Sequence, residues 1–543
     1  MANTKYIFIT GGVSSSLGGG LLAASLAKLL QANGYTVALQ KLDPYINVNS
    51  GMLNPYEHGE CYVTDDGHEG DIDLGVFERF TASKASRNSD VTAGRVFQNV
   101  IRKEREGAYL GKTVQVVPNI TNEIKQHIYR MSNSDRVDFV IVEIGGTVGD
   151  IESLPFIEAE RQVRYELGKD RWMSIHLTFV PYIAAAKELK TKPTQHSVKE
   201  LLELGVQPDM LVLRTEHPLT DRSRAKVGLF CNVQPEAVIE LLDQPTQYDC
   251  PLVLHEENID GVVLDKFGLK PRQNPDEALA EWKSFVKTLH NAVRTVKIAL
   301  VGKYVELPDA YRSIREALTM AASHFDRRLE LTYIQAEKIT ELNARQMLEG
   351  LDAILVAPGF GQRGVEGKMQ AVKYARLNNI PFFGIGLGMQ CAVIDFAKNV
   401  MGMLDADSTE LNQAASCKVF DICADEKSTF GFEGTMRLGS YNTRLKPGSL
   451  AAAIYGADCI AERHRHRFEF NNDFSERLEE KGMVISGSNA DYGFADIVEI
   501  PEHPWFIGTI FHPEFNSVVG RPHPLFLSFV EAAIKCSENN FKL

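Results

Sequence analysis

The sequence lacks the cysteine patterns that mark metal sites and disulfide frameworks. Its eight cysteines are scattered, with no CxxC pair and no spacing typical of metal ligands. We therefore expect neither a zinc-ribbon module nor a small disulfide-stapled scaffold. Free, dispersed thiols are typical of a reducing compartment, so the cysteine usage predicts a cytoplasmic protein.

Long apolar runs and a secretory leader pattern are also missing. No run of 18 or more apolar residues occurs, so no transmembrane helix is predicted. The chain enters a strand-like run without a charged segment and an apolar core before it, so no signal peptide is predicted. The net charge is −13, from 58 basic and 71 acidic residues, which argues against a general nucleic-acid binder. We predict a protein that binds neither membranes nor nucleic acid.

The pattern that is present is an alternation of buried strands and amphipathic helices such as Leu21–Ala32. At roughly 150 residues per domain, 543 residues suggest two to four domains. The alternation favours parallel sheets covered by helices, and hence an α/β fold with two doubly wound domains. We place the domains at 1–269 and 297–537, joined by a linker at 270–296. The expected strands are Tyr6–Thr10, Thr36–Leu39, Phe139–Ile144, Ser174–Val180, Met210–Arg214, Val296–Gly302, Ala353–Val356, Phe382–Ile385 and Phe506–Phe511.

A glycine-rich loop follows the first predicted strand. Gly11, Gly12 and the run Gly18–Gly20 allow backbone N–H groups to approach phosphate oxygens, and the following helix adds positive potential. The Walker-type pattern requires a lysine followed by serine or threonine, and Gly19 and Gly20 occupy those positions. The loop alone is therefore either a phosphate loop without its lysine or a turn without a ligand.

Carboxylates and cations follow at loops where this fold binds ligands. Lys41 opens the segment Lys41–Asn47 after the second strand, and the segments Asp71–Gly75 and Val142–Glu152 supply carboxylates. Hard oxygen ligands of this kind hold Mg²⁺ against nucleotide phosphates. Lys190–Ser197 packs two lysines and several hydroxyl and amide donors into eight residues. Taken alone, each segment is more often a solvated surface loop without a ligand. The functional interpretation of Lys190–Ser197 is a segment that binds a polyphosphate or a pyrimidine, called here the pyrimidine clamp.

The second half carries the outline of an acyl-transfer site. Gly384–Gly388 has the shape of a nucleophile elbow, with Gly386 where the nucleophile belongs. Ala357–Gly361 forms a turn whose N–H groups are suited to an oxyanion hole. Phe511–Phe515 supplies His512 and Glu514, in the arrangement of a base and the carboxylate that orients it. Cys391 lies in the elbow helix, and we expect it to point away from the elbow tip.

Together these segments resemble the CTP synthase family, in order and along nearly the whole chain. The resemblance includes the signature Val301–Tyr311 and Phe230–Val233. It implies an N-terminal P-loop-like amidoligase domain and a C-terminal class I glutamine amidotransferase domain. In the family, ATP phosphorylates the uracil 4-oxygen of UTP, ammonia attacks C4, and phosphate leaves to give CTP. A Cys-His-Glu triad releases that ammonia from L-glutamine.

The resemblance also implies cofactors, regulators and assembly. Mg²⁺ and the co-substrate ATP are expected, with GTP as allosteric activator and CTP as feedback inhibitor. A homotetramer, arranged as a dimer of dimers, and filaments of it are expected. His58, in the segment Glu57–Glu60, resembles a residue that lines the route of ammonia.

Site residues carry over position by position. Mg²⁺ is expected on Asp73 and Glu143. The implied ATP contacts are Ser16, Leu17, Gly18, Gly19, Gly20, Leu21, Lys41, Asp73 and Asp243. The implied UTP and CTP contacts are Ser15, Asp150, Ile151, Glu152, Lys190, Thr191, Lys192, Pro193, Thr194, Gln195 and Lys226. The implied glutamine contacts are Gly359, Leu387, Gly388, Met389, Gln390, Glu410 and Arg467, and the catalytic positions are Gly386, His512 and Glu514.

Two departures from the family pattern decide what this chain is expected to do. Gly19 replaces the phosphate-loop lysine, so the phosphorylation step should be impaired. Gly386 replaces the nucleophilic cysteine, so the glutaminase step should be lost while external ammonia bypasses it. The alternative is a catalytically inactive nucleotide-binding or assembly homologue. A P-loop ATPase fused to an amidotransferase fits less well, because Lys190–Ser197 matches the synthase specifically.

Overall fold

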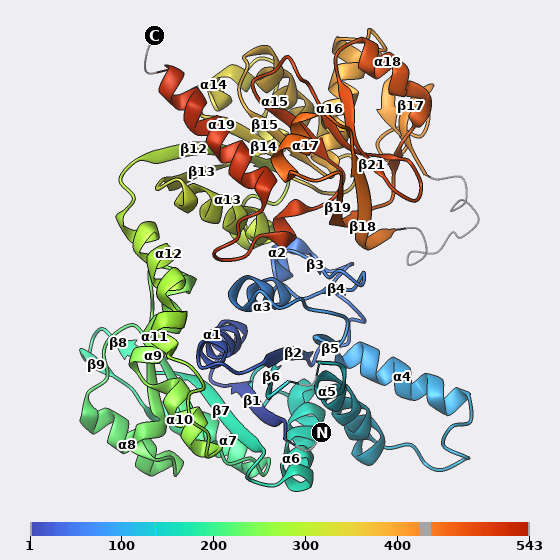
Figure 1. The fold of residues 1–543 in the computed structure, drawn as a ribbon. Coiled ribbons are helices and arrows are strands. Elements are labelled where there is room, and N and C mark those ends of the chain that lie inside the picture. Colours follow the sequence, from blue (N-terminus) through green and yellow to red (C-terminus); the bar gives the residue numbers. More distant parts are fainter. Residues whose placement is uncertain (1–2, 136, 423–435, 541–543) are drawn as a thin grey trace. The chain divides into compact units, whose positions relative to one another are not determined.

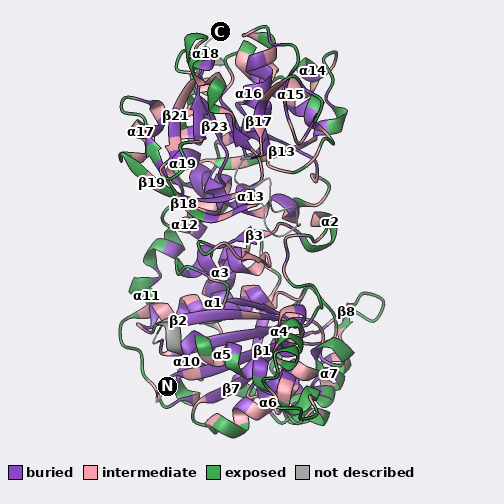
Figure 2. Ribbon diagram, turned by 90° about the vertical axis from the view of Figure 1, so that its right-hand side faces the viewer, coloured by how far each residue is buried: buried purple, intermediate pink, exposed green. Residues whose placement is uncertain are grey.

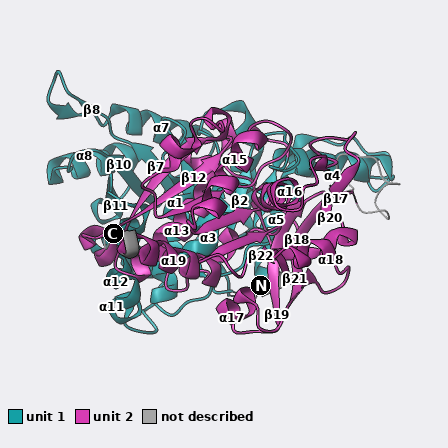
Figure 3. Cartoon of the chain, turned by 90° about the horizontal axis from the view of Figure 1, so that it is seen from above, with its two compact units in different colours: residues 1–51, 70–286 teal, residues 52–69, 287–543 magenta. Residues whose placement is uncertain are grey.

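The computed structural model describes residues 3–135, 137–422 and 436–540. The chain forms two compact units that are not contiguous in sequence (Figure 3). Unit 1 contains residues 1–51 and 70–286, and unit 2 contains residues 52–69 and 287–543. A short N-terminal segment, 52–69, therefore packs with the C-terminal half. The domain boundaries proposed from the sequence stay a prediction.

Unit 1 is built on a seven-stranded parallel sheet in the order β11-β10-β7-β1-β6-β2-β5 (Figure 1). The central strands are apolar on both faces, because helices cover both sides, and they are buried along almost their whole length (Figure 2). The strands are β1 Lys5–Gly11, β2 Val37–Asp43, β5 Asp90–Thr92, β6 Phe139–Ile144, β7 Trp172–Phe179, β10 Met210–Thr215 and β11 Val238–Leu242.

The helices of unit 1 begin at the loops where the site residues were expected. The glycine-rich loop leads into α1, and the predicted pyrimidine clamp leads into α7. The helices are α1 Gly19–Ala32, α3 Asp73–Thr81, α4 Ala93–Arg105, α5 Thr121–Asp135, α6 Leu154–Leu167, α7 Lys192–Glu203, α8 Asp221–Cys231, α9 Cys250–Glu256, α10 Ile259–Lys266, α11 Pro275–Ala278 and α12 Ala280–Asn291, with the last crossing into unit 2. A small hairpin, β8 Tyr182–Ile183 and β9 Glu188–Leu189, precedes α7.

Unit 2 is built on a nine-stranded mixed sheet in the order β13-β12-β14-β15-β23-β22-β21-β18-β19. The strands from β13 to β23 are parallel, and those beyond β23 are antiparallel. The parallel half is the predicted doubly wound core, and the antiparallel extension was not predicted. The strands are β12 Thr295–Gly302, β13 Arg328–Gln335, β14 Ala353–Val356, β15 Phe382–Ile385, β18 Arg437–Leu445, β19 Cys459–His466, β21 Val484–Asn489, β22 Ala495–Glu499 and β23 Phe506–Thr509.

Helices pack on both faces of this sheet, so it has one apolar core on each side. The helices are α2 Pro55–His58, α13 Arg312–His324, α14 Ala344–Leu348, α15 Val365–Leu377, α16 Leu387–Asn399, α17 Leu450–Tyr455, α18 Ser475–Glu480 and α19 Pro524–Asn540. Three short strands, β16 Ala406–Ser408, β17 Cys417–Asp421 and β20 Glu469–Phe470, form a separate small sheet.

The expected strands are confirmed, and three of them have the same bounds as predicted: β6, β14 and β15. The last one is shorter, because β23 ends at Thr509 before the loop that carries His512. The segment predicted as a linker, 270–296, contains the two helices α11 and α12. Within the described residues, no helix has both the length and the apolar character needed to cross a membrane.

Candidate active sites

The glycine-rich loop of unit 1 runs from the end of β1 at Gly11 to the start of α1 at Gly19. A Cβ atom built on Gly12 would lie 1.7 Å from Ser197 Oγ and 2.8 Å from His176 Nε2, so only glycine fits there. Val13 and Ser16 have positive φ angles of 81° and 61°, which L-residues rarely adopt. The free N–H groups at the start of α1 make this loop suitable for an anion.

A buried histidine joins this loop to the predicted pyrimidine clamp. His176 Nδ1 lies 2.8 Å from Thr10 Oγ1, and its Nε2 lies 2.9 Å from Ser197 Oγ on α7. Burial lowers the pKa of His176 to about 4, so the ring is neutral at physiological pH. This side chain therefore ties β1 and α7 together through β7.

Three carboxylates surround one lysine at the ends of β2 and β6. Lys41 Nζ lies 2.7 Å from Asp73, 3.0 Å from Glu143 and 4.0 Å from Asp71. Burial disfavours the charge on Lys41, but Asp73 and Glu143 outweigh it and hold its pKa well above the usual value. Burial raises the pKa of Asp71 and of Glu143 to about 7, against the lowering effect of Lys41.

The two predicted Mg²⁺ ligands, Asp73 and Glu143, converge on a cation position that the Lys41 ammonium holds here. Their hard carboxylate oxygens fit Mg²⁺, with phosphate oxygens and water as the remaining ligands. Among the described residues, no group of three or more potential ligand side chains has metal-binding geometry by itself. The fit therefore depends on a bound nucleotide.

Gly19 lies directly against this cluster. A Cβ built on Gly19 would lie 2.4 Å from Glu143 Oε1, and one on Gly20 would lie 2.3 Å from Asp73 Cγ. The Glu143 carboxylate thus occupies the space through which the stem of a lysine at position 19 would pass. A lysine there requires Glu143 to move, at low cost because the carboxylate is the far end of a flexible side chain.

The residues predicted to bind the pyrimidine nucleotide lie on three loops and two helices. Val148 N–H donates to Gly11 O at 2.8 Å, which joins the loop before Asp150 to the glycine-rich loop. Thr194 is buried at the start of α7 and lies 3.1 Å from Thr178 Oγ1, whereas Lys190 pairs with Glu188. Lys226 lies on α8, which packs on α7, but no described bond joins it to the other predicted residues.

Arg214 is a residue that sequence reasoning missed. Its Nη1 donates to Leu17 O in the glycine-rich loop at 2.8 Å, and its Nε donates to Asp243 Oδ1 at 2.9 Å. It therefore joins two predicted ATP segments. The available signal was a charged residue at the carboxyl end of an otherwise apolar strand, Met210–Thr215.

In unit 2 the elbow forms between β15 and α16. Gly386 has φ 56° and ψ −114°, the strained turn that a nucleophile elbow requires, and its N–H donates to Thr509 O at 2.7 Å. Gly384 and Gly388 are needed for close packing, because a Cβ on Gly388 would lie 2.2 Å from Val356 O. The elbow geometry is thus complete without a side chain at its tip.

The histidine and glutamate of the predicted triad are in place. His512 Nδ1 lies 2.8 Å from Glu514 Oε1, and both side chains are buried. The ring of His512 also stacks on Phe515 with 5.3 Å between centroids. A Cβ atom built on Gly386 would lie 3.7 Å from the other ring nitrogen, His512 Nε2. A sulfur one bond further on would lie within hydrogen-bonding reach of His512.

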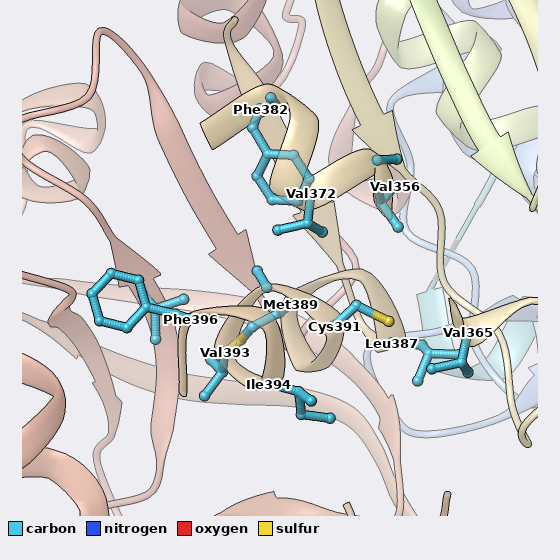
Figure 4. Close-up of a cluster of buried hydrophobic side chains, with 14 of the residues drawn as sticks. Val356, Val365, Val372, Phe382, Leu387, Met389, Cys391, Val393, Ile394 and Phe396 are labelled. Carbon is cyan, nitrogen blue, oxygen red and sulfur yellow. The ribbon is translucent and has the colours of Figure 1, made fainter. Parts of the chain in front are cut away.

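Cys391 does not fill the missing position. It is fully buried in the apolar cluster around α16, and burial raises the pKa of its thiol to about 11. Figure 4 shows Cys391 on α16 within this cluster of buried apolar side chains. A buried, protonated thiol is a poor nucleophile.

The predicted glutamine contacts lie around the elbow and the turn 357–361. Glu410 accepts a bond from Gly361 N–H at 2.7 Å, and Leu387–Gln390 form the first turn of α16. Gln390 is buried, and within the described part of the chain its Oε1 has no hydrogen-bond partner. Sequence reasoning did not single out two buried lysines beneath this turn, Lys303 and Lys368.

Comparison with known proteins gives a family for each half of the chain. Residues 5–269 match the family model for the CTP synthase N-terminus, and residues 306–532 match that for class I glutamine amidotransferases. A CTP synthase from Porphyromonas gingivalis is 55% identical over 98% of this chain and 99% of its own length. One from Cytophaga hutchinsonii is 56% identical over 98% of each chain.

Among solved structures, the glutaminase domain of Trypanosoma brucei CTPS with bound acivicin is 38% identical. It covers 44% of this chain and 94% of its own, with a TM-score of 0.43. This chain belongs to the CTP synthase family, whose members are ligases that form carbon–nitrogen bonds.

Proposed function

We propose that this chain is a CTP synthase that has lost its glutaminase step and retains a slowed, ammonia-dependent amination of UTP. The observation that carries the proposal is the nucleophile position, where Gly386 has no side chain. A Cβ atom built on Gly386 would lie 3.7 Å from His512 Nε2. His512, paired with Glu514, and the 357–361 turn lie around that position. Without a thiol the site cannot form the thioester through which ammonia leaves glutamine.

In unit 1 we propose that the glycine-rich loop and Lys41 bind the phosphates of ATP. Arg214 and Asp243 flank the other end of that nucleotide. The segment Asp150–Glu152, Ser15, Lys190–Gln195 and Lys226 hold UTP, with its uracil 4-oxygen toward ATP. Mg²⁺ on Asp73 and Glu143 would neutralise charge on the transferred phosphoryl group.

The protein side chains then have three tasks at this site. The loop N–H groups and Lys41 orient the phosphates, the clamp on α7 orients the pyrimidine, and the closed site keeps water from the phosphorylated intermediate. Without a lysine at position 19, one cation aimed at the phosphates is missing. Loss of such a preorganised charge slows a reaction by on the order of 10²–10³.

In unit 2 we propose that glutamine still binds without being cleaved. The turn at Gly359, the first turn of α16, Glu410 and Arg467 would hold it, as the sequence predicts. GTP activation, feedback by CTP, a homotetramer, filaments and a cytoplasmic location stay predictions from the family resemblance.

The deciding experiment measures CTP formation from UTP and Mg-ATP, with glutamine and with ammonium chloride in parallel. We expect CTP with ammonium chloride only. Gly386→Cys should restore the glutamine-dependent reaction, and the matched control Gly386→Ala, which adds a Cβ but no thiol, should not. If Gly386→Cys releases no ammonia from glutamine, the proposed glutaminase site around Gly386, His512 and Glu514 is wrong.

A second candidate is a catalytically inactive nucleotide-binding or assembly homologue. The observation that favours it is the ion pair of Lys41 with both Asp73 and Glu143, next to Gly19. This reading predicts UTP binding without CTP formation from either nitrogen source. Ammonia-dependent turnover excludes it.

A further inference from the structure

Two fully buried lysines lie beneath the turn that flanks the empty nucleophile position. Lys303 follows the end of β12, and Lys368 lies on α15. The solvent-exposed fraction of each is 0%. A buried ammonium is costly unless its donors are satisfied, so its partners indicate why it is there.

Both lysines bind the same turn. Lys303 Nζ donates to Phe360 O at 2.7 Å and to Gly361 O. Lys368 Nζ donates to Ala357 O at 2.5 Å and more weakly to Pro358 O at 3.4 Å. Four of the five carbonyl groups of the turn 357–361 are thus held by two side chains. Within the described residues, neither ammonium lies within 4 Å of a carboxylate.

Holding these carbonyl groups also orients the N–H groups. In a planar trans peptide the C=O and N–H bonds point in opposite directions. The Phe360 carbonyl faces Lys303, and on the other side of that peptide the Gly361 N–H donates to Glu410 Oε1 at 2.7 Å. The Pro358 carbonyl faces Lys368, so the Gly359 N–H points away from that lysine.

The peptide between Pro358 and Gly359 lies next to the place where chemistry would occur. A Cβ atom built on Gly386 would lie 3.2 Å from Pro358 Cβ. The Gly359 N–H of this peptide is the candidate donor to the oxygen of a carbonyl attacked from the elbow. Such a donor stabilises the transition state only if its direction is fixed before the reaction.

We propose that Lys303 and Lys368 are positioning residues for glutamine hydrolysis, which fix the 357–361 turn with the Gly359 N–H toward the elbow and the Gly361 N–H toward Glu410. This inference rests on the proposed function of unit 2. Beyond that function, it assigns to two lysines on remote elements the task of building the oxyanion hole.

The surroundings of the lysines support this role. Burial lowers the pKa of Lys303 to about 8 and that of Lys368 to about 7. Both lysines therefore lie in a place that disfavours the charged form. Among the described residues, the carbonyl groups of the turn are the hydrogen-bond acceptors of both Nζ atoms, and Glu410 and Glu337 act on them through longer-range electrostatics.

The first test uses the full-length chain with Gly386 unchanged and does not depend on activity. Hydrogen exchange of the peptide spanning residues 357–361 reports how firmly the turn is held, because Gly361 N–H is protected by its bond to Glu410. Lys303→Met and Lys368→Met should speed exchange in this peptide. Lys373→Met, on the same helix but at a surface ion pair with Glu341, should not.

The second test adds the same substitutions to Gly386→Cys and measures ammonia release from glutamine. We expect kcat to fall by on the order of 10²–10³ while KM changes little, since a fixed N–H donor acts in the transition state. Alkylation of the introduced thiol by iodoacetamide, a displacement without an oxyanion, should keep its rate. A collapsed site would slow both reactions.

The outcomes separate the two proposals. Unchanged exchange in the turn, or an unchanged kcat in the Gly386→Cys background, overturns the positioning role. A Gly386→Cys parent that releases no ammonia overturns the proposed glutaminase site instead. Hydrogen exchange then still decides whether the two lysines hold the turn.

Discussion

At the scale of single residues, two glycines and one histidine lead to the most specific predictions about substitutions in this chain. A Cβ atom built on Gly386 would lie near His512, and one built on Gly19 would lie against Glu143. His176 is buried between two hydroxyl groups on separate elements. Each position therefore allows a sharp substitution with a matched control.

Replacing Gly19 by lysine should speed the ammonia-dependent reaction. The new ammonium adds a cation at the phosphates, and its stem displaces the Glu143 carboxylate, which lies 2.4 Å from the Cβ position. We expect kcat with ammonium chloride to rise by on the order of 10²–10³. Gly19→Ala, which crowds Glu143 equally but adds no charge, should give no increase. An unchanged rate in Gly19→Lys would mean that Lys41 alone suffices.

Replacing His176 should alter how stability depends on pH. Its pKa is lowered to about 4 in the folded protein, below the usual value of 6.5, so between these values the unfolded chain binds more protons. This histidine therefore lowers the free energy of unfolding as pH falls from about 6.5 through 4. His176→Gln, which cannot titrate, should flatten that fall, as measured by urea unfolding at pH 7 and pH 4.5. An unchanged slope would contradict the assignment.

At the scale of elements, the contact of α6 with β7 buries a carboxyl group. Glu160 on α6 has an exposed fraction of 0%, and burial raises its pKa to about 8. The folded state keeps this proton between about pH 4.5 and 8, where the unfolded chain has released it. The stability that Glu160 provides is therefore present below about pH 4.5 and is lost as pH rises through 8.

Glu160→Gln removes this titration while keeping the shape of the side chain. We expect the variant to gain stability relative to the parent as pH rises from 5 to 8, because only the parent must keep a proton on a buried acid. Urea unfolding at both pH values measures the difference. Glu158→Gln, at a partly exposed position on the same helix, is the control and should leave the difference small.

At the scale of the whole molecule, unit 2 depends on a segment from the first eighth of the chain. Arg463 is fully buried and pairs with Asp65, and it also donates to Tyr62 Oη at 2.9 Å and to Val63 O at 3.0 Å. The Glu60 carboxylate accepts the N–H of Ser313 at the start of α13. Segment 52–69 is therefore part of the fold of unit 2.

Asp65→Asn should destabilise unit 2 although residue 65 is remote from it in sequence. The substitution removes the negative charge that Asp65 places against a buried guanidinium, which should cost about 1–3 kcal/mol. Hydrogen exchange read peptide by peptide should rise across 287–543 and stay unchanged across 70–286. Glu57→Gln, at a mostly exposed side chain of the same segment, should have little effect. Equal acceleration in both ranges would contradict the assignment of this segment to unit 2.

The sequence by itself determined most of the parallel framework and the position of the elbow. Strands buried on both faces are continuous apolar runs, and for that reason β6, β14 and β15 have the predicted bounds. Close helix–strand packing leaves glycine at fixed spacing, so the elbow could be recognised although Gly386 has no side chain. Both signals are local, because they record the burial and backbone geometry of consecutive residues.

Only the tertiary structure decided which remote polar groups meet. Arg214 reaches a loop 197 positions earlier, Lys303 and Lys368 reach one turn from two elements, and segment 52–69 joins unit 2. No periodicity marks such partners, because a single buried cation follows neither helix nor strand spacing. Its partner is set by which strand ends and helices the sheet order brings together.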